Sequence, residues 1–302
     1  MGTPQPALFV DELAHHAHLE WTLRADSTSA TAREAVAAAR RAAATLRSPA
    51  SCWGFDPMLW RRWSACPDNV RPFAEVTGPG GTAPATQRSV WLWLAGNAHE
   101  KLWESARAAS REMLAVADRT DELWCYSPFD NRDPIGFVDG TENPALDEAI
   151  QVAVYPSGQV GAGGSAVLLQ KWVHDLTAFE ALPVVDQEAV IGRTRVTDEE
   201  LDPKPVTAHN ARTVVTDAHG EERHILRRNT PYASVAETGT MFIGCTNDPP
   251  LMDEMVARMF GTSADGLTDH LTRYSTPVTG SYYFVPPVED LTRVFGPLEP
   301  DD

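Results

Sequence analysis

The sequence is poor in cysteine and in long apolar runs. Its four cysteines, among 302 residues, stand far apart and form no CxxC pair. This usage is typical of reduced thiols in a cytoplasmic protein, and we expect no zinc site built from them. No apolar run is long enough for a membrane span, and the first residues, MGTPQPALFVDEL, have neither a basic flank nor a long apolar segment. We therefore expect no membrane span and no secretory signal.

Positive charge is also in short supply. The chain has 25 Lys and Arg against 42 Asp and Glu, which gives a net charge of −17. A surface that binds nucleic acid needs a net cationic face, so this balance argues against a nucleic-acid partner. Small molecules or proteins are the expected partners.

Two stretches of the chain repeat the same order of patterns. The apolar runs at 7–21 and 167–176 both have the character of a strand. Residues 90–114 show a strand pattern, a Gly-Asn turn and an amphipathic helix pattern, and residues 240–260 show the same order. Because the two copies lie about half the chain apart, they predict an internal duplication in which each half is a β-sheet with helices on one side.

Local signals mark the boundaries within this plan. The glycine-rich segment 155–164 is expected to link an N-terminal half, 1–154, to a C-terminal half, 165–302. Thr31 and Glu34 form a capping-box pattern for an alanine-rich helix, and Asp248-Pro249-Pro250 marks the start of another.

Proline and charge patterns set further boundaries. A charged helix is expected over about 186–201, ending before Pro203 because proline interrupts a helix. Residues 273–287 predict a turn followed by an aromatic strand, and the acidic tail PLEPDD is expected to fray.

The stretch PIGFVDGTENP places Asp139 between Gly136 and Gly140. Glycines at these positions would let the backbone adopt conformations closed to other residues or approach a bulky group. Asp139 would then point into whatever lies there. The alternative is an ordinary Asp-Gly turn, which is common in loops.

Histidines offer several candidate ligands. His15, His16 and His18 lie in or beside the first expected strand, where structural roles are favoured. His219 and His224 could form a non-haem iron site with Glu221 or Glu222, although DAHGEER between two strand-like runs favours a hairpin turn.

His209 differs from these histidines in its surroundings. It follows the stiff Pro-Lys-Pro segment in LDPKPVTAHNAR, so a rigid loop could hold its imidazole in place. A ligand role and a structural role both remain open for it.

The segment HILRRNTPYAS, at 224–234, has the pattern of a strand. Side chains alternate across a strand, so Arg227 and Asn229 would share one face while Arg228 takes the other. Arg227 and Asn229 could face a pocket, with Arg228 in solvent. The alternative is an edge strand whose charges all lie on the surface.

Taken together, the GxxDG motif, His209 and the Arg227-x-Asn229 pair resemble the dye-decolorizing peroxidase family. The resemblance extends over nearly the whole chain and includes IGFVDGTENP, HILRRNTPY, GTMFIGCTNDP and YSTPVTGSYYFVPP. The length and short loops are most similar to the compact bacterial B-type branch. This resemblance implies an α+β fold of the dimeric α+β barrel type, with two ferredoxin-like halves that each contain an antiparallel sheet.

The same resemblance implies a haem b cofactor, iron protoporphyrin IX, and assigns roles by motif position. His209 would be the proximal ligand of the haem iron. Asp139 would be the distal acid-base residue, Arg227 the distal arginine that also reaches the haem, and Asn229 would complete the distal polar set.

The implied activity is a peroxidase that reduces hydrogen peroxide through a ferryl intermediate and oxidises dyes, phenols or similar small reductants, with Mn²⁺ as a further candidate. A haem carrier, or a protein that releases iron from haem, is the alternative. A homo-oligomer is expected. Some family members carry a C-terminal extension that directs them into a protein nanocompartment, and the end PLEPDD gives no support for that association here.

Overall fold

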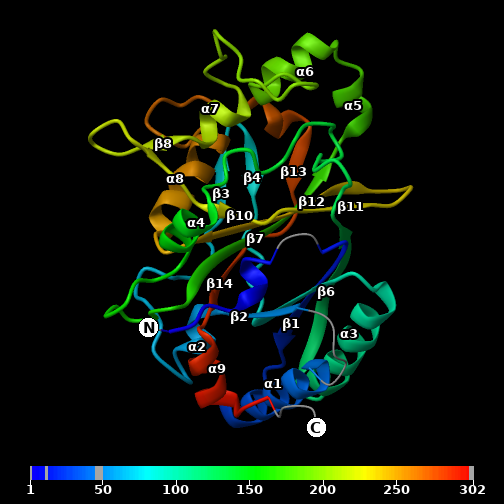
Figure 1. Ribbon diagram of the computed structural model, residues 1–302, viewed down its shortest axis with the longest axis vertical. Coiled ribbons are helices and arrows are strands. Elements are labelled where there is room, and N and C mark those ends of the chain that lie inside the picture. The colour runs from blue at the N-terminus through cyan, green and yellow to red at the C-terminus, as the bar shows by residue number, and fades with distance from the viewer. Residues whose placement is uncertain (1, 11–12, 45–49, 299–302) are drawn as a thin grey trace.

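The computed structural model describes residues 2–10, 13–44 and 50–298. Its main feature is an antiparallel ten-stranded sheet that runs through both halves of the chain (Figure 1). The N-terminal half contributes four neighbouring strands in the order β2, β5, β1, β6. Their bounds are β1 (His15–Leu23), β2 (Ala50–Phe55), β5 (Val90–Gly96) and β6 (Ala117–Tyr126).

The C-terminal half repeats this arrangement. Its neighbouring strands follow the order β10, β12, β7, β14, while β11 also pairs with β12 and β13 with β7. Their bounds are β7 (Ser165–His174), β10 (Leu226–Arg227), β11 (Thr230–Ala233), β12 (Thr238–Thr246), β13 (Ser275–Pro277) and β14 (Ser281–Val285). In both halves the first long strand lies third in this order, beside the strand that precedes a long helix, so the topology agrees with the expected duplication.

The two halves meet at two junctions. Phe284 of β14 pairs with Phe55 of β2, which joins the halves into one sheet. At the other junction β6 lies against β11. Among the described residues no ladder pairing joins β6 to β11, so the sheet is not closed into a complete barrel.

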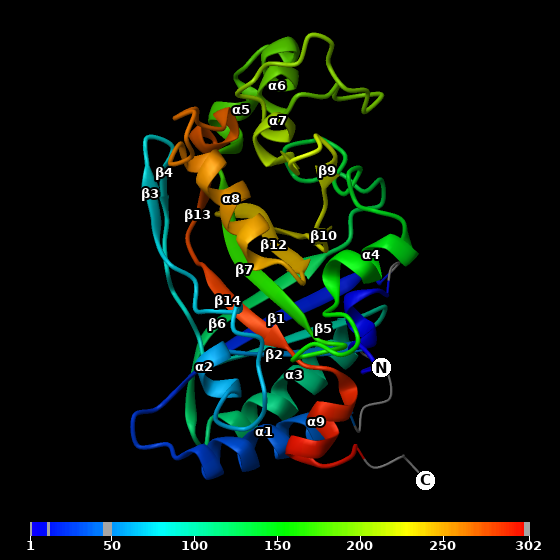
Figure 2. The same cartoon turned by 90° about the vertical axis from the view of Figure 1, so that its left-hand side faces the viewer.

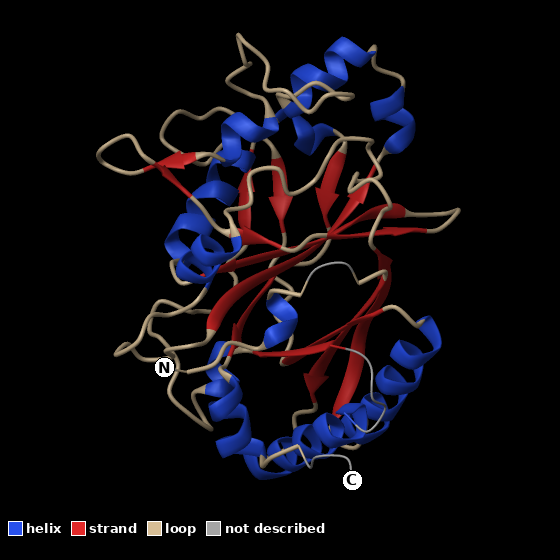
Figure 3. Cartoon of the chain, in the orientation of Figure 1, coloured by secondary structure: helices blue, strands red, loops and turns tan. Residues whose placement is uncertain are grey.

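Helices cover the outer faces of the sheet (Figures 2 and 3). The helices α1 (Ser29–Ala44), α3 (His99–Met113) and α9 (Val288–Phe295) cover the N-terminal half, and α8 (Pro249–Phe260) covers the C-terminal half. Shorter helices lie around them: α2 (Pro57–Trp60), α4 (Leu146–Ala153), α5 (Leu176–Glu180), α6 (Val184–Ile191), α7 (His209–Thr213), and the 3₁₀ turns η1 (Pro6–Leu8) and η2 (His270–Arg273). Two small hairpins complete the fold, β3 (Val76–Gly78) with β4 (Gly81–Ala83) and β8 (Val215–Thr216) with β9 (Glu222–Arg223).

Strand alternation divides the core into layers. On β5, Val90, Leu92 and Leu94 face the helices, while Trp91 and Trp93 face the opposite way. The second set packs against the inward side chains of β7, β12 and β14, so the two halves of the sheet share one buried layer. The outer face of the C-terminal half packs against α8 instead.

Several expected elements are confirmed. Strand β5 followed by α3, and β12 followed by α8, reproduce the repeated pattern at 90–114 and 240–260. Strands β13 and β14 fulfil the expectation for 273–287. No helix in the described part of the chain is long and apolar enough to cross a membrane.

The linker expectation has no direct test. Residues 155–164 form a loop between α4 and β7, and the division into halves at that loop stays a prediction. The expected frayed tail lies largely outside the described residues.

Other expectations were wrong in detail. The first strand starts at His15 rather than residue 7, because Pro6 opens the 3₁₀ turn η1 over the first residues of the expected run. Residues 11–12 of that run lie outside the described chain. The charged helix expected to reach residue 201 ends at Ile191, because Gly192 adopts the left-handed conformation with φ 96° and caps it.

Two more details differ from the expectation. The segment 224–234 is not one strand, because it contains the two separate strands β10 and β11, and Arg228 and Asn229 lie between them. The N-terminal cap of α1 is Thr28 rather than Thr31. Thr28 forms reciprocal hydrogen bonds with Thr31, in place of the expected pair of Thr31 with Glu34. The Thr31 N–H donates to Thr28 Oγ1 at 3.1 Å, and the Thr28 N–H donates to Thr31 Oγ1 at 3.0 Å.

We expect Thr28→Ala to lower the free energy of unfolding by about 1 kcal/mol, because it leaves the Thr31 N–H without its side-chain acceptor. Urea unfolding of the parent and the variant measures this change. Thr28→Ser keeps the hydroxyl and should remain close to the parent. Equal stabilities of Thr28→Ala and the parent would show that the cap contributes nothing.

Candidate active site

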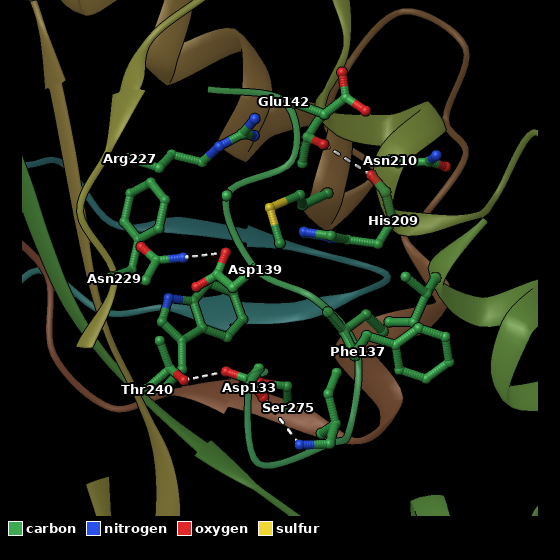
Figure 4. Close-up of a pocket in the computed structure, with 18 of the residues that line it drawn as sticks. Asp133, Phe137, Asp139, Glu142, His209, Asn210, Arg227, Asn229, Thr240 and Ser275 are labelled. Carbon is green, nitrogen blue, oxygen red and sulfur yellow. Dashed lines mark hydrogen bonds between the residues drawn. The ribbon is translucent and has the colours of Figure 1, made fainter. Parts of the chain in front are cut away.

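A cavity lies between the outer face of the C-terminal half of the sheet and helices α7 and α8 (Figure 4). It holds about 1240 Å³ of space free of protein atoms, counted out to its open mouth. A cavity with mainly apolar walls and a few polar groups is typical of a site for an organic ligand.

The walls of this cavity are mainly apolar and come from regular elements. Helix α8 contributes Met252, Met255, Val256 and Met259, whose spacing puts them on one helical face. Strand β12 adds Phe242. Flexible methionine side chains adapt their shape to a flat ligand better than branched ones do.

Strand β7 supplies a polar row on the same face of the sheet. Gln170, Trp172 and His174 alternate along β7 and all line the cavity. The Gln170 side chain is buried, and within the described residues its Nε2 atom has no hydrogen-bond partner. A buried amide without a partner is costly, so this donor indicates that a polar group of a ligand or a water completes the site.

The GxxDG loop, which belongs to the N-terminal half, reaches over this cavity. Gly136 and Gly140 have φ values of 91° and 82°, so both positions use the conformational freedom of glycine. A Cβ atom at Gly136 would lie 2.6 Å from Arg195 Nη2, which shows how closely this loop passes its neighbour. The loop is pinned beside Asp139, whose N–H donates to the Asn131 carbonyl at 2.9 Å. The carboxylate of Asp139 is thereby directed into the cavity.

Three side chains that the sequence singled out, those of Asp139, Arg227 and Asn229, line this cavity together. Asn229 Nδ2 donates to Asp139 Oδ1 at 3.2 Å, and the Arg227 side chain extends into the same cavity. Arg228 lies on the other side of its segment, with its guanidinium carbon 6.0 Å from the centre of the Trp93 ring. The prediction that Arg227 and Asn229 share a face is therefore confirmed, whereas the expectation that Arg228 is solvated was wrong.

Asn143 fixes the position of Arg227. The Arg227 N–H donates to Asn143 Oδ1 at 2.8 Å, and Asn143 Nδ2 donates back to the Arg227 carbonyl at 2.9 Å. One amide from the GTENP stretch therefore holds the backbone of Arg227 in both directions.

The carboxyl group of Asp139 is electrostatically unusual. Burial raises its pKa above the ordinary 3.8, and the nearby carboxylate of Asp133 raises it further, against the opposing effects of Asn229 and Arg227. A carboxyl group whose pKa is raised can hold a proton closer to neutral pH than an exposed aspartate can. This property suits a group that accepts and returns a proton.

Asp133 forms a second polar network in the same cavity. Burial acts to raise its pKa, but contacts with His174 and Thr240 and the Ile135 N–H outweigh that effect, and the pKa is lowered. His174 Nε2 lies 3.2 Å from Asp133 Oδ1, and the Ser275 hydroxyl bonds to His174 Nδ1 at 2.8 Å.

His209 occupies the opposite wall, at the start of α7. Its Nδ1 atom lies 2.6 Å from Oδ2 of Asp269, a carboxylate that is fully buried. The other oxygen, Oδ1, accepts the Leu271 N–H at 2.8 Å, so Asp269 is itself held in place. This arrangement leaves the Nε2 side of the His209 ring directed toward the cavity (Figure 4). An imidazole backed by a carboxylate in this way is oriented as a metal ligand.

Charged residues gather at the cavity mouth. Arg193 lies 2.6 Å from Glu142 Oε1 and 2.8 Å from Asp198 Oδ1. Arg193 and Glu142 both line the cavity, so cation and anion are available at its edge.

The other histidine candidates do not join this site. His219 lies in the loop of the β8–β9 hairpin and His224 follows β9; both are exposed, as the hairpin interpretation predicted. No group of three or more His, Cys, Asp or Glu among the described residues is arranged to hold a metal ion, so the non-haem iron alternative finds no support. His16 and His18 are buried on the inner face of the sheet.

Four residues of the site were not predicted from the sequence: Asp133, Asn143, His174 and Asp269. Asp133 immediately precedes the stretch PIGFVDGTENP and Asn143 lies within it, so their closeness to Asp139 in the sequence was an available signal. Asp269 stands 60 residues from His209 in the chain, and its only local signal is its place as the cap before η2. Nothing in the sequence pairs those two residues.

The chain matches known proteins throughout its length. The family model for the C-terminal part of Dyp-type peroxidases matches residues 130–290. The dye-decolorizing peroxidase of Mycobacterium tuberculosis is 40% identical over 230 residues, which cover 74% of this chain and 69% of that protein. The one from Brevibacterium linens is 35% identical over 259 residues, with coverage of 82% and 71%.

Solved structures agree with these matches. A putative Dyp-type peroxidase of Shewanella oneidensis superposes with a TM-score of 0.89 at 27% identity, covering 97% of this chain and 99% of that one. A variant of DypB from Rhodococcus jostii, solved in complex with heme, gives a TM-score of 0.88 at 31% identity, with coverage of 96% and 98%. The fold is that of the Dyp-type peroxidases. The chain belongs to the dye-decolorizing peroxidase family, so the resemblance seen in the sequence is confirmed, and it is a peroxidase.

We expect Asp139→Asn to be more stable than the parent at neutral pH. The raised pKa means that ionised Asp139 is disfavoured in the folded state, so its contribution to stability falls as pH rises through the folded-state pKa. Asparagine carries no such charge. The difference in the free energy of unfolding between Asp139→Asn and the parent should become smaller as pH falls toward 3.8, the ordinary pKa of aspartate.

Urea unfolding of the haem-free protein at several pH values measures this difference. Asp26→Asn, which changes an exposed aspartate, is the matched control and should show no comparable gain. A variant at position 139 that is less stable than the parent at pH 7 would contradict the expected direction.

Proposed function

We propose that this chain is a haem b peroxidase that reduces hydrogen peroxide and oxidises small organic reductants. The observation that carries the proposal is the arrangement across one apolar cavity, with His209 backed by Asp269 on one wall and Asp139, Arg227 and Asn229 on the other. These two sets are the proximal and distal groups that a peroxidase requires.

The cavity fits iron protoporphyrin IX in its chemistry. Methionine, valine and phenylalanine side chains offer apolar walls to a porphyrin ring, and the His209 imidazole offers a nitrogen ligand to the iron. Arg193 and Arg227 are cations that can meet carboxylate groups at its edge. The Rhodococcus jostii DypB variant in complex with heme supports this assignment.

When bound, the haem supplies the redox chemistry, while the protein supplies ligation, orientation and electrostatics. His209 would hold the iron, and Asp269 would accept a hydrogen bond from its Nδ1–H. That bond fixes the tautomer of the imidazole and increases its electron-donating character. The distance of 2.6 Å between Nδ1 and Oδ2 supports a strong interaction of this kind.

Asp139 would move the proton. Cleavage of hydrogen peroxide requires one oxygen to lose a proton and the leaving oxygen to gain one. Asn229 holds Oδ1 of Asp139 at 3.2 Å, so we assign the moving proton to Oδ2. The raised pKa of Asp139 brings both acceptance and return of the proton closer to neutral pH than they are for an exposed aspartate.

Arg227 would stabilise charge. Its guanidinium remains cationic at every working pH, so it can stabilise the negative charge that develops on the leaving oxygen. The two hydrogen bonds from Asn143 keep the Arg227 backbone in place while the side chain does so.

We propose dyes, phenols and related small molecules as reductants, with Mn²⁺ as a further candidate. A DypB variant, 31% identical to this chain, has been solved in complex with manganese. The net charge of −17 would favour cationic reductants over anionic dyes at neutral pH, and this bias would weaken as carboxylates gain protons.

The haem-carrier alternative would need only the His209 ligand. Asp139 and Asn229 are joined by a hydrogen bond, and Arg227 is held beside them through its backbone by Asn143. This arrangement exceeds what a carrier requires and favours the peroxidase.

Assembly stays a prediction. A homo-oligomer in the cytoplasm remains our expectation. An encapsulated Dyp-type peroxidase of Mycobacterium smegmatis is 31% identical, with a TM-score of 0.89. Co-expression of this chain with an encapsulin shell tests whether it associates with such a compartment.

We expect His209→Ala to lose or grossly alter the Soret absorption of the haem-loaded protein and to abolish its reaction with peroxide. The physical reason is that the mutation removes the proposed iron ligand. Stopped-flow absorbance after mixing with a slight excess of peroxide measures both effects. His270→Ala, which removes a nearby imidazole that does not line the cavity, should behave as the parent. An unchanged spectrum and rate in His209→Ala would overturn the proposed ligand, and a haem-loaded parent that ignores peroxide would favour the carrier.

Arg227→Ala should slow the reaction with peroxide on the order of 10² to 10³-fold, the usual cost of removing one preorganised charge-stabilising group. Asp139→Ala should instead change the pH dependence of that rate, because it removes the titrating group. Arg228→Ala is the matched control, since it removes a cation from the opposite side of the same segment. If Arg227→Ala reacts with peroxide as fast as the parent, the roles proposed for Arg227 and Asp139 are wrong.

A further inference from the structure

A row of buried aromatic side chains lies on the other face of the strand that floors the cavity. On β7, Gln170 and Trp172 line the cavity, while Val167 and Leu169 point to the opposite face. There they pack in the shared inner layer against Tyr283, Trp91 and Trp93. The cavity and this row are therefore separated by the thickness of one sheet.

The rings form a continuous stack. Tyr283 lies over Trp91 with ring centroids 5.7 Å apart and planes 24° apart. Trp91 lies over Trp93 at 6.2 Å and 14°, and the His18 ring stacks with both tryptophans at 6.0 and 5.8 Å. These separations fall in the range in which aromatic rings interact directly.

Each oxidisable ring in this stack donates its own proton to a base. The Tyr283 hydroxyl donates to Glu20 Oε1. Trp91 Nε1 donates to His18 Nδ1 at 3.3 Å, and Trp93 Nε1 donates to His16 Nδ1 at 3.2 Å. Apolar packing alone does not require three donor-to-base pairs in one row.

Burial makes the Tyr283–Glu20 pair the distinctive one. Tyr283 and Glu20 are 0% and 2% exposed, so a carboxylate is held out of water next to a phenol. An ionised carboxylate in such a place is costly, and taking up a proton removes the buried charge. Burial accordingly raises the pKa of Glu20 to about 7.

Charged and titratable groups face Glu20 from every side. Strand β6 brings Asp121 and Glu122, β7 brings Lys171, and β1 brings His18. Arg88, just before β5, pairs with Asp121 at 3.2 Å. Asp121 acts to raise the pKa of Glu20, whereas the Tyr283 hydrogen bond and Arg88 act to lower it.

We propose that Tyr283 and Glu20 form a buried redox site in which Tyr283 gives up an electron and passes its proton to Glu20. This inference rests on the proposed peroxidase function, because the electron acceptor is a haem oxidised by hydrogen peroxide in the cavity on the other face of β7. The stacked tryptophans share the site electronically and extend it along the inner layer.

The step balances in atoms and charge. The O–H bond of Tyr283 breaks and an O–H bond to Glu20 Oε1 forms, along the hydrogen bond that already joins them. One electron passes from Tyr283 to the oxidised haem, which is thereby reduced by one electron. The products in the protein are a neutral tyrosyl radical and a neutral carboxylic acid, so a buried negative charge disappears.

Electrostatics places the oxidised group at the Tyr283 end of the stack. The guanidinium carbon of Arg228 lies 6.0 Å from the centre of the Trp93 ring, and its positive charge disfavours removal of an electron there. The negative charge of Glu20 favours removal of an electron from Tyr283. The oxidised residue is therefore expected to be Tyr283 rather than Trp93.

The adjacent tyrosine is a natural comparison. Tyr282 points to the other face of β14, packs with Trp172 and Met255, and donates to Asp253 Oδ1 at 2.7 Å. Asp253 lies at an exposed position, and although partial burial of its carboxyl group raises its pKa, it is far less enclosed than Glu20, which is 2% exposed. Oxidation of Tyr282 would therefore remove less buried charge, and we expect the radical at Tyr283 instead.

Freeze-quench electron paramagnetic resonance tests the proposal on the haem-loaded protein, mixed with peroxide in the absence of any reductant. Absorbance of the same mixture records how much haem has reacted. We expect a tyrosyl radical signal, scaled to the reacted haem, in the parent and in Tyr282→Phe, and its loss in Tyr283→Phe. The Soret band and thermal unfolding of each variant show whether it still folds and binds haem.

Glu20→Gln supplies a second arm that leaves Tyr283 in place. Because Glu20 accepts the proton only when ionised, the scaled signal of the parent should rise as pH increases through about 7. The signal of Glu20→Gln should be strongly reduced and should lack this rise. A purely structural role for Glu20 would not produce that pH dependence.

The outcomes separate the two proposals. A Soret band that peroxide leaves unchanged overturns the peroxidase function, and this inference with it. A Soret band that responds, with the same radical signal in Tyr283→Phe as in the parent, or with loss in Tyr282→Phe instead, overturns the redox site alone. A signal in Glu20→Gln that equals the parent at every pH overturns the role of Glu20 as proton acceptor.

Discussion

The antiparallel pairing of β7 with β12 on one side and β14 on the other fixes the positions of both the cavity and the inner aromatic layer. Because side chains alternate along a strand, the same pairing directs Gln170, Trp172 and His174 to the cavity and Val167 and Leu169 to the inner layer. A shift of this strand pairing by one residue would exchange the cavity-facing and inner-layer side chains, and would destroy both the cavity and the inner layer. The geometry of both the cavity and the inner layer therefore depends on the register of β7.

Function and stability oppose each other at Asp139. The loop that carries it uses two glycines in left-handed conformations, and burial makes its ionised form unfavourable in the folded state. Other parts of the fold must compensate for this cost. The hydrogen bonds from Asn229 and the Asn143 clamp on Arg227 do so locally, because they hold the loop and the neighbouring strand together.

Local patterns predicted local structure well. Alternation placed Arg227 and Asn229 on one face, and the repeated strand and helix patterns revealed the duplication. The partner of His209 could not be found in the same way, because Asp269 approaches it only after α7 and η2 dock against each other. The helix expected up to residue 201 failed for a similar reason, since the left-handed glycine at its true end leaves only a weak signal in the sequence. Interactions between distant segments depend on packing, which periodicity does not encode.

The Asn143 clamp makes the cavity depend on both halves of the chain. Asn143 comes from the first of the two repeated units, whereas Arg227, His209 and most of the apolar walls come from the second. The first unit covers a cavity that the second unit mainly encloses. Neither unit contains the full set of cavity side chains, so two fragments of the chain would have to reassemble before the cavity could form.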